Sequence, residues 1–389
     1  MAFFSALLNQ VLIGFGVKYL YIFLNLALIL VCLAFGLRKG SISKFTIPLL
    51  YVLAIFITLL ISAFFLKGTT DAVVAFGLYT MPVLVWVSVY ACYTPVRYFD
   101  IFSSSLLLSG IIGYLAIPQY FFSPTLFGLI ISDSDQMRWA NGKSFIEYAF
   151  FFRATSTLGS PQIFGLFCAL TLIITLRYKK LLNPKVFYFS ALGLAIGGIL
   201  SGNKSFFLIV ILYILFTNFQ KFFSSIRTLL LIGVILLSFI FFSQITIVND
   251  LALQRVFSLE SIVEQETIEN SRISKYAYIL NETNPFYGNG LGSITNKSTE
   301  GLSAAESYLL KIYYEVGIIP FFIFIALCIE SAIKGLNRSI RDFHIICLTI
   351  FSMIIVHAFE SPIFMIIWGH FLGEAAYSKY IEKKEIHAS

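Results

Sequence analysis

Long apolar stretches alternate with short polar ones along almost the whole chain. Most are about 20 residues long, which as helices would cross roughly 30 Å of membrane hydrocarbon. Lys18 to Leu37 is one such span, and Ala2 to Gly16 is apolar but short for another. The further spans are predicted at 46–66, 72–92, 101–121, 155–176, 186–200, 204–220, 228–247, 305–328, 343–358 and 362–380. The pattern therefore predicts an all-α polytopic membrane protein with 11 or 12 transmembrane helices.

The composition agrees with this pattern and argues against an ordinary globular protein and against a nucleic-acid-binding protein. Of the 389 residues, 58% are hydrophobic and 12% are charged, whereas about a quarter of an ordinary globular domain is charged. The net charge of +7 does not predict a nucleic-acid partner, because the basic residues lie in short loops rather than on one face. The five cysteines fall inside apolar stretches without metal-type spacing, so we expect neither disulfides nor a metal site.

The basic residues also predict the orientation in the membrane, because short cytoplasmic loops are rich in Lys and Arg. Alternate loops contain Arg38, Lys39, Lys44, Arg97, Arg177, Lys179, Lys180, Lys185, Lys221, Arg227, Lys334, Arg338, Arg341, Lys379, Lys383 and Lys384. All of these fall on one side, which we take as the cytoplasm. The loops at 122–154, 201–204 and 248–304 then lie outside the cell membrane.

The segment 248–304 is too long for a simple connector, and its apolar residues recur with helical spacing. Its second helix should end near Asn281, because Pro285 follows and Gly288, Gly290 and Gly292 are predicted to form a tight turn. We therefore divide the chain into N-terminal transmembrane helices (1–247), a large helical outer loop (248–304), and C-terminal transmembrane helices with a cytoplasmic tail (305–389).

Ionisable residues near the membrane are candidates for function, because burying a charge there is costly. Arg153 opens a span, Lys204 lies in a short outer turn, and Arg272 lies in the large loop. Each has a simpler explanation: Arg153 and Lys204 could reach lipid headgroups, and Arg272 could be a solvated surface charge.

Three further candidates lie toward the C-terminus. Glu306 begins the predicted span 305–328, where it could also cap the helix. His357 and Glu360 lie at the outer end of the penultimate span, and a histidine bonded between helices is the commoner case. Lys311 and Glu315, four residues apart, should pair with each other and serve the structure rather than the chemistry.

Four segments, taken in order, resemble the family of O-antigen polymerases and O-antigen ligases of bacterial envelopes. Arg153-Ala-Thr-Ser-Thr-Leu-Gly159-Ser-Pro161-Gln-Ile-Phe-Gly165 is similar to the stretch that opens a central span of that family, and Leu200-Ser-Gly-Asn-Lys204-Ser to its Ser-Gly-Ser-Arg turn. Arg272 with Asn284-Pro285-Phe-Tyr-Gly288-Asn-Gly290-Leu-Gly292 is similar to the pattern of its large periplasmic loop. Glu306-Ser-Tyr308-Leu with Glu315-Val-Gly317 is similar to the segment that closes this loop.

The chain departs from the family's pattern at two positions. Lys204 stands where arginine is usual, which removes the bidentate grip that arginine has on a phosphate. Glu306 stands where the ligases have a histidine-asparagine pair, which favours a polymerase over a ligase.

The resemblance implies a metal-independent, inverting glycosyltransferase of lipopolysaccharide biosynthesis that needs no cofactor. It would transfer glycan from an undecaprenyl (polyprenyl) diphosphate to a second lipid-linked repeat, on the periplasmic side of the bacterial inner membrane. Arg153, Lys204 and Arg272 would bind the diphosphate, with Arg272 also acting in catalysis. Glu306 would be the general base, with His357 or Glu360 as substitutes.

The implied partners are the lipid-linked oligosaccharide, as donor and acceptor, membrane lipids and a chain-length regulator protein. Two alternatives stay open. One is an O-antigen ligase that joins the polymer to the lipid A core. The other is a lipid-linked glycan flippase or transporter, whose ionisable residues should lie near mid-membrane and whose helices should be broken in both halves.

Overall fold

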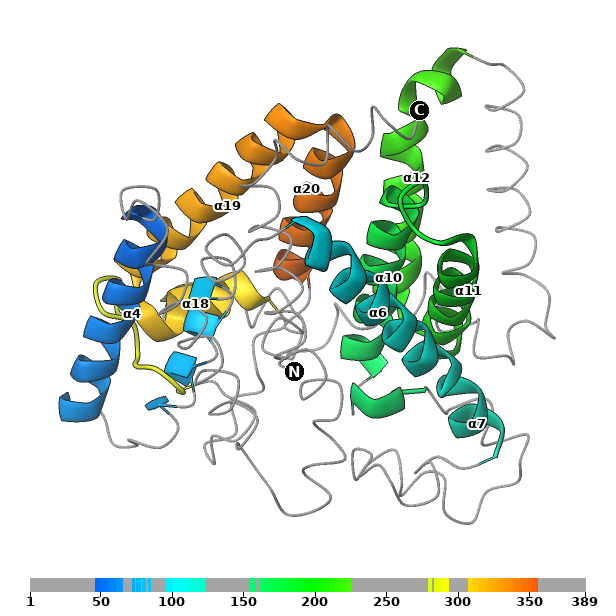
Figure 1. The fold of residues 1–389 in the computed structure, drawn as a ribbon. Helices are drawn as coiled ribbons and strands as arrows, with labels where there is room; N and C mark the ends of the chain where they lie inside the picture. Colours follow the sequence, from blue (N-terminus) through cyan, green and yellow to red (C-terminus); the bar gives the residue numbers. More distant parts are fainter. Residues whose placement is uncertain are drawn as a thin grey trace. The chain divides into compact units, whose positions relative to one another are not determined.

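The computed structural model of the chain describes residues 46–65, 72–73, 75–77, 79–81, 83–84, 95–122, 154–158, 161–224, 279–281, 283–293 and 307–355. These residues are mostly helical and contain no strand, so the helical class predicted from the sequence is confirmed for them (Figure 1). The chain forms two compact units. The first comprises residues 1–7, 17–101 and 269–389, and the second comprises 8–16 and 102–268.

The described core of the first unit is built around helix α19 (Ile318–Arg338). This helix packs against α4 (Thr46–Phe65), α18 (Tyr308–Val316) and α20 (Ile340–Ile355). Phe324 of α19 lies at the centre, with its ring centroid 5.6 Å from that of Tyr51 and 6.0 Å from that of Tyr308. Aromatic contacts therefore join α4 to two helices, α18 and α19, that lie more than 200 residues later in the sequence.

The predicted span 305–328 is wrong, because the chain breaks at Gly317 into the short helix α18 and the longer helix α19. Gly317 has a φ of 81°, a left-handed conformation that ends α18 and favours glycine. Pro320 follows in the first turn of α19, where its missing N–H costs no helical hydrogen bond. The apolar segment that could cross a membrane is therefore Ile318–Asn337.

The second unit contains most of α6 (Pro95–Tyr114), then α7 (Ala116–Phe121), the short 3-10 helix η2 (Ser156–Leu158), α10 (Pro161–Arg177), α11 (Pro184–Leu200) and α12 (Lys204–Ser224). Helix α10 packs against both α11 and α12. Glycines bring α6 and α11 together, since a Cβ on Gly113 would lie 2.2 Å from the carbonyl oxygen of Gly193. We predicted a span from residue 155, but its regular helix begins at Pro161, after the turn at 154–158.

The other predicted helices that fall on described residues are confirmed as helices. They correspond to the predicted segments at 46–66, 101–121, 186–200, 204–220 and 343–358, with ends that differ by a few residues. In the segment predicted at 72–92, the described residues are also helical. The predicted segments at 228–247 and 362–380, and all those before residue 46, lie outside the described residues.

Length and apolar composition mark two described stretches as able to cross a membrane. They are Ser103–Phe121, which runs through α6 and α7, and Ile318–Asn337 in α19. Four apolar helical stretches are shorter: Ile47–Ser62, Pro161–Arg177, Pro184–Leu200 and Lys204–Thr217. Two helices of this kind are also found in soluble proteins, so the predicted 11 or 12 spans stay a prediction.

The surface of α19 carries a continuous apolar stripe. Its large side chains at helical spacing are at least half exposed: Ile319, Phe322, Ile329, Ile333 and Leu336. In contrast, buried hydroxyl groups bond to the carbonyl of the preceding turn, as Ser331 does to Leu327 and Thr349 to Ile345. Apolar residues outside and self-satisfied polar residues inside are the arrangement that lipid favours.

Candidate functional site

In the first unit, the glycine-rich turn at 283–293 docks on the end of α18. The backbone N–H of Asn289 donates to the carbonyl oxygen of Tyr314 at 2.7 Å, and that of Gly290 donates to the carbonyl oxygen of Glu315 at 3.1 Å. Carbonyls in the last turn of a helix have no partner within the helix. The turn therefore supplies the hydrogen bonds that α18 lacks at its end.

Two glycines make this docking possible. Gly288 has a φ of 69°, and a Cβ there would lie 2.6 Å from the carbonyl oxygen of Glu315. A Cβ on Gly317 would lie 2.5 Å from the carbonyl oxygen of Phe286. Since both backbones approach more closely than a side chain allows, only glycine fits at either position. The tight turn predicted from the glycine spacing is confirmed.

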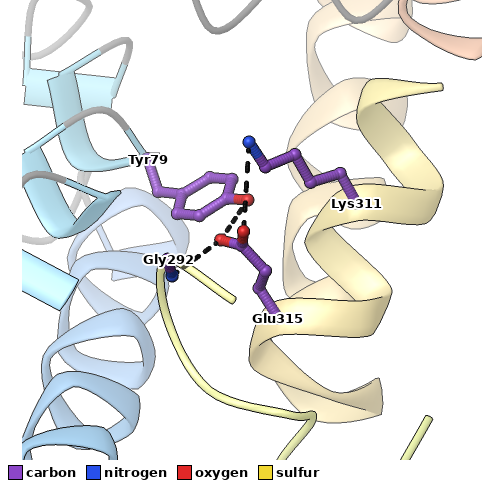
Figure 2. A network of polar contacts seen from close by, with 4 residues as sticks. All are labelled: Tyr79, Gly292, Lys311 and Glu315. Carbon is purple, nitrogen blue, oxygen red and sulfur yellow. Dashed lines mark hydrogen bonds and ion pairs between the residues drawn. The ribbon is translucent and has the colours of Figure 1, made fainter. Parts of the chain in front are cut away.

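A buried carboxylate ties the turn to two helical segments (Figure 2). Glu315 is fully buried, and its Oε2 accepts hydrogen bonds from the Tyr79 hydroxyl at 2.8 Å and from the Gly292 N–H at 3.2 Å. Its Oε1 lies 3.9 Å from the Nζ of Lys311, which is 2% exposed. The predicted pairing of Lys311 with Glu315 is confirmed, and the buried pair stabilises the turn from within.

Helix α4 holds the same turn from another direction. The Oγ of Ser62 accepts a hydrogen bond from the N–H of Leu291 at 3.0 Å. Ser62 also donates to the carbonyl oxygen of Thr58, one turn earlier in α4. The end of the turn is therefore fixed by both a carboxylate and a hydroxyl.

In the second unit, one buried amide organises the irregular backbone that precedes α10. Oε1 of Gln119 accepts from the N–H of Thr155 at 2.8 Å and from that of Ser156 at 2.6 Å, while its Nε2 donates to the Thr155 hydroxyl. Ser156 has a φ of 47°, unusual for a residue with a side chain, and its hydroxyl donates to the Ile112 carbonyl. Gln119 thus satisfies the backbone at a strained bend.

The same bend is joined to the turn that carries Lys204. The N–H of Ala154 donates to the carbonyl oxygen of Leu200 at 3.1 Å. The side-chain amide of Asn203 donates to the carbonyl oxygen of Gln162 at 2.9 Å. A Cβ on Gly165 would lie 2.5 Å from the Cβ of Asn203, so glycine allows this close approach. The described parts of the segments 153–165 and 200–205, which both carry the resemblance, are therefore in contact.

Lys204 is the one predicted site residue among the described ones. It is the first residue of α12, is partly exposed, and follows Asn203, whose Oδ1 accepts from the Ser205 N–H. A cation at a helix N-terminus adds to the positive end of the helix dipole. This position therefore favours an anion, whether a headgroup or a diphosphate.

The other predicted site residues, Arg153, Arg272, Glu306, His357 and Glu360, lie outside the described residues. The residue after Glu306 is described: Ser307 is the N-cap of α18, and its Oγ accepts from the Leu310 N–H. In the described part of the chain, no group of three or more His, Cys, Asp and Glu side chains could hold a metal ion.

Sequence reasoning missed Gln119, Tyr79 and Ser62. Gln119 had a usable signal, because an amide in an apolar segment needs a partner. Tyr79 had none, because tyrosine is common in apolar helices and its partner Glu315 lies 236 residues later in the chain.

No model of a known protein family matches the chain, and no curated protein matches it significantly.

If the Lys311–Glu315 pair holds the turn, removing one charge should cost more than removing both. We expect Lys311→Met and Glu315→Gln each to lose about 3–5 kcal/mol of unfolding free energy, because a buried charge is left alone, and the double variant to recover part of this. Unfolding of the purified protein in detergent measures it. The matched control is the partly exposed pair Glu330–Lys334, where the same changes should cost at most about 1 kcal/mol. Strictly additive losses at 311 and 315 would contradict the coupling.

Replacing Gln119 should loosen the bend at 154–158 specifically. Gln119→Leu leaves two buried N–H groups without an acceptor, at about 1–3 kcal/mol each. We expect faster hydrogen–deuterium exchange at the amides of Thr155 and Ser156, and a milder effect for Gln119→Glu, which keeps an acceptor oxygen. Gln162→Leu is the control, since Asn203 bonds to its backbone carbonyl. Unchanged exchange in Gln119→Leu would refute this role.

Proposed function

We propose that the chain is a surface-polysaccharide (O-antigen) polymerase of the bacterial inner membrane. In this proposal it is a multi-pass protein with 11 or 12 transmembrane helices. It transfers glycan from a polyprenyl diphosphate carrier to a hydroxyl of another lipid-linked repeat, on the periplasmic side. It acts as a metal-independent, inverting glycosyltransferase.

The observation that supports the proposal most is the packing of the segments that carry the resemblance. Within the first unit, the turn Asn284–Gly292 bonds directly to Tyr314 and Glu315. Within the second unit, the bend before α10 bonds to Leu200, and the first turn of α10 bonds to the Asn203 side chain. Within each unit, segments that resemble the family and are separated in the sequence are thus in contact with each other.

The exposed surfaces support the membrane part of the proposal. The apolar stripe of α19 runs from Ile319 to Leu336, over the length of a candidate span. Helix α4 likewise exposes Leu49, Leu50, Leu53, Phe56 and Ile57. Contiguous apolar surface of this kind favours contact with lipid over contact with water.

The proposed chemistry assigns a role to each candidate residue. The leaving diphosphate gains negative charge, which fixed cations stabilise in a site with little water. Arg153, Lys204 and Arg272 have this role in the proposal. Glu306 removes the proton from the attacking hydroxyl, with His357 or Glu360 as substitutes.

The transporter alternative draws on one feature of the structure. The described residues of both units contain irregular backbone next to a helix, at Gly317 and at residues 154–158, and broken helices are a feature of transporters. At both described breaks, however, backbone groups are bonded to protein partners such as Gln119 and Pro285. A polymerase is therefore the better supported of the two.

Deleting the gene in its native strain tests the class of function. We expect the ladder of polysaccharide lengths on a gel to collapse to a single repeat on the acceptor lipid. Polymer that remains on its carrier, with no capped acceptor, would instead indicate the ligase. Single carrier-linked repeats that accumulate on the cytoplasmic side would indicate the flippase.

Single substitutions in the complemented strain test the assigned residues. We expect Arg272→Ala and Glu306→Ala to abolish polymer growth at unchanged membrane levels, and Lys204→Met to lower it about 10²-fold or more, with partial activity in Lys204→Arg. Lys185→Met is the matched control, because Lys185 is an exposed lysine at the opposite end of α11 from the Lys204 turn. Full-length polymer in both alanine variants would refute the assignment.

A further inference from the structure

Two adjacent aromatic side chains project from the tip of the docked turn. Phe286 is 73% exposed and Tyr287 is 50% exposed, whereas Gly288 beside them is buried. Large aromatic residues are seldom presented to water in pairs without a binding partner. We therefore expect a binding partner to cover the two rings, and the surroundings of the turn indicate its chemical class.

The turn holds this pair rigidly. The side-chain Oδ1 of Asn284 accepts from the N–H of Phe286 at 3.1 Å, and the N–H of Gly288 donates to the Asn284 carbonyl at 2.9 Å. The buried Glu315 and Ser62 fix the end of the turn at Gly292 and Leu291. The backbone that carries the two rings therefore has little freedom to lose when they bind something.

A direct hydrogen bond places the pair at one end of a candidate span. The N–H of Ile318, the first residue of α19, donates to the carbonyl oxygen of Pro285 at 2.9 Å. The span Ile318–Asn337 has 20 residues, and at about 1.5 Å per residue it matches the roughly 30 Å of hydrocarbon in a bilayer. The docked turn at 283–293, which bonds to Ile318, is therefore level with one boundary of the hydrocarbon.

The charges of α19 identify this boundary as the outer one. Its basic residues Lys334 and Arg338 lie at the far end of the helix, which basic residues mark as cytoplasmic. The apolar stripe begins next to the turn, with Ile319 and Phe322 both more than half exposed. The exposed rings thus continue a surface that already favours lipid.

We infer that Phe286 and Tyr287 form an aromatic anchor in the outer interface of the bilayer, where they hold the large loop against the lipid headgroups. The inference rests on the membrane placement in the proposed function and deepens it. Aromatic side chains are enriched at this depth because their rings are apolar and their edges tolerate water.

The polar groups of the turn favour lipid over a sugar as the occupant. A sugar would need hydrogen-bond partners around the rings as well as their faces. The N–H groups of Phe286 and Gly288 are already bonded to Asn284, and the Pro285 carbonyl to Ile318. The anchor instead sets the depth of the loop. The diphosphate of a lipid carrier lies among the headgroups, so the loop that carries Arg272 is held at the level of its proposed substrate.

Tryptophan fluorescence in reconstituted vesicles tests the anchor. The natural tryptophans are first replaced by phenylalanine at Trp86, Trp139 and Trp368, and Phe286→Trp is then introduced into the full-length chain. The vesicles contain phosphatidylethanolamine and phosphatidylglycerol with bromine either near the headgroup or deep in the acyl chain. We expect a blue-shifted emission that the shallow bromines quench more strongly than the deep ones.

Phe322→Trp in the same background separates the anchor from the membrane placement itself. Phe322 is 59% exposed on the lipid-facing stripe and about 6 Å further along α19, so the deeper bromines should quench it relatively more. If bromines quench Phe322→Trp but only aqueous iodide quenches Phe286→Trp, the anchor is refuted and the span stands. Shielding of Phe286→Trp from both quenchers would indicate protein or glycan contact, which also refutes the anchor. If neither bromine quenches Phe322→Trp, the membrane placement of α19 fails and the anchor fails with it.

A second measurement leaves the natural tryptophans in place. Benzoylphenylalanine introduced at position 286 by amber suppression should form lipid adducts on irradiation, detected by mass spectrometry. The same residue at position 322 is the positive control. Lipid adducts at 322 alone would overturn the anchor.

Discussion

The described part of the first unit depends on one buried carboxylate. Glu315 is fully buried and would be costly there without partners, but its partners include the Tyr79 hydroxyl, the Gly292 N–H and the Lys311 ammonium. These partners come from separate stretches of the chain, so satisfying the charge forces the stretches together. The Lys311 ammonium lies 3.9 Å from the carboxylate, beyond hydrogen-bond range. The hydrogen bonds from Tyr79 and Gly292 orient the carboxylate of Glu315. The docking of the glycine-rich turn on α18 depends on this arrangement.

The second unit solves the same problem with a neutral group. Irregular backbone among apolar helices must find hydrogen-bond partners inside the protein. At the bend before α10, one amide oxygen of Gln119 accepts from two successive N–H groups, and Ser156 bonds to the Ile112 carbonyl. An uncharged amide costs less to bury than a carboxylate, and it needs no counter-ion. In each unit, buried polar side chains therefore join an irregular segment to its helices, with Glu315 and Ser62 in the first and Gln119 and Ser156 in the second.

The sequence predicted what is local and missed what is distant. Apolar runs predicted the helices, glycine spacing predicted the turn at 288–292, and i,i+4 spacing predicted the Lys311–Glu315 pair, because each depends on neighbouring residues. The break at Gly317 was also local, but the apolar run continues through it and concealed the signal of Gly317 followed by Pro320. The contact of Tyr79 with Glu315 spans 236 positions, and that of Gln119 with Thr155 spans 36. Tertiary packing decides such contacts, and the spacing of apolar residues along the sequence does not predict them. Of the candidate site, the contact between the bend and the Lys204 turn could be expected only through the resemblance.

Two lysines differ in burial, and the proposed function gives them different roles: Lys311 a structural one and Lys204 an anion-binding one. Lys311 is 2% exposed and its partner Glu315 is fully buried, so their charges are committed to each other and to the turn. Lys204 is partly exposed at the start of α12. In its turn, backbone N–H groups donate to the Ser201 and Asn203 side chains, and the Asn203 side-chain amide donates to the Gln162 carbonyl. These hydrogen bonds join the start of α12 to α10 and order the backbone around Lys204. A rigid turn that presents a cation at a helix N-terminus can bind an anion without first paying to order its backbone. This is why a change at Lys204 should weaken activity more than folding, whereas a change at Lys311 should do the reverse.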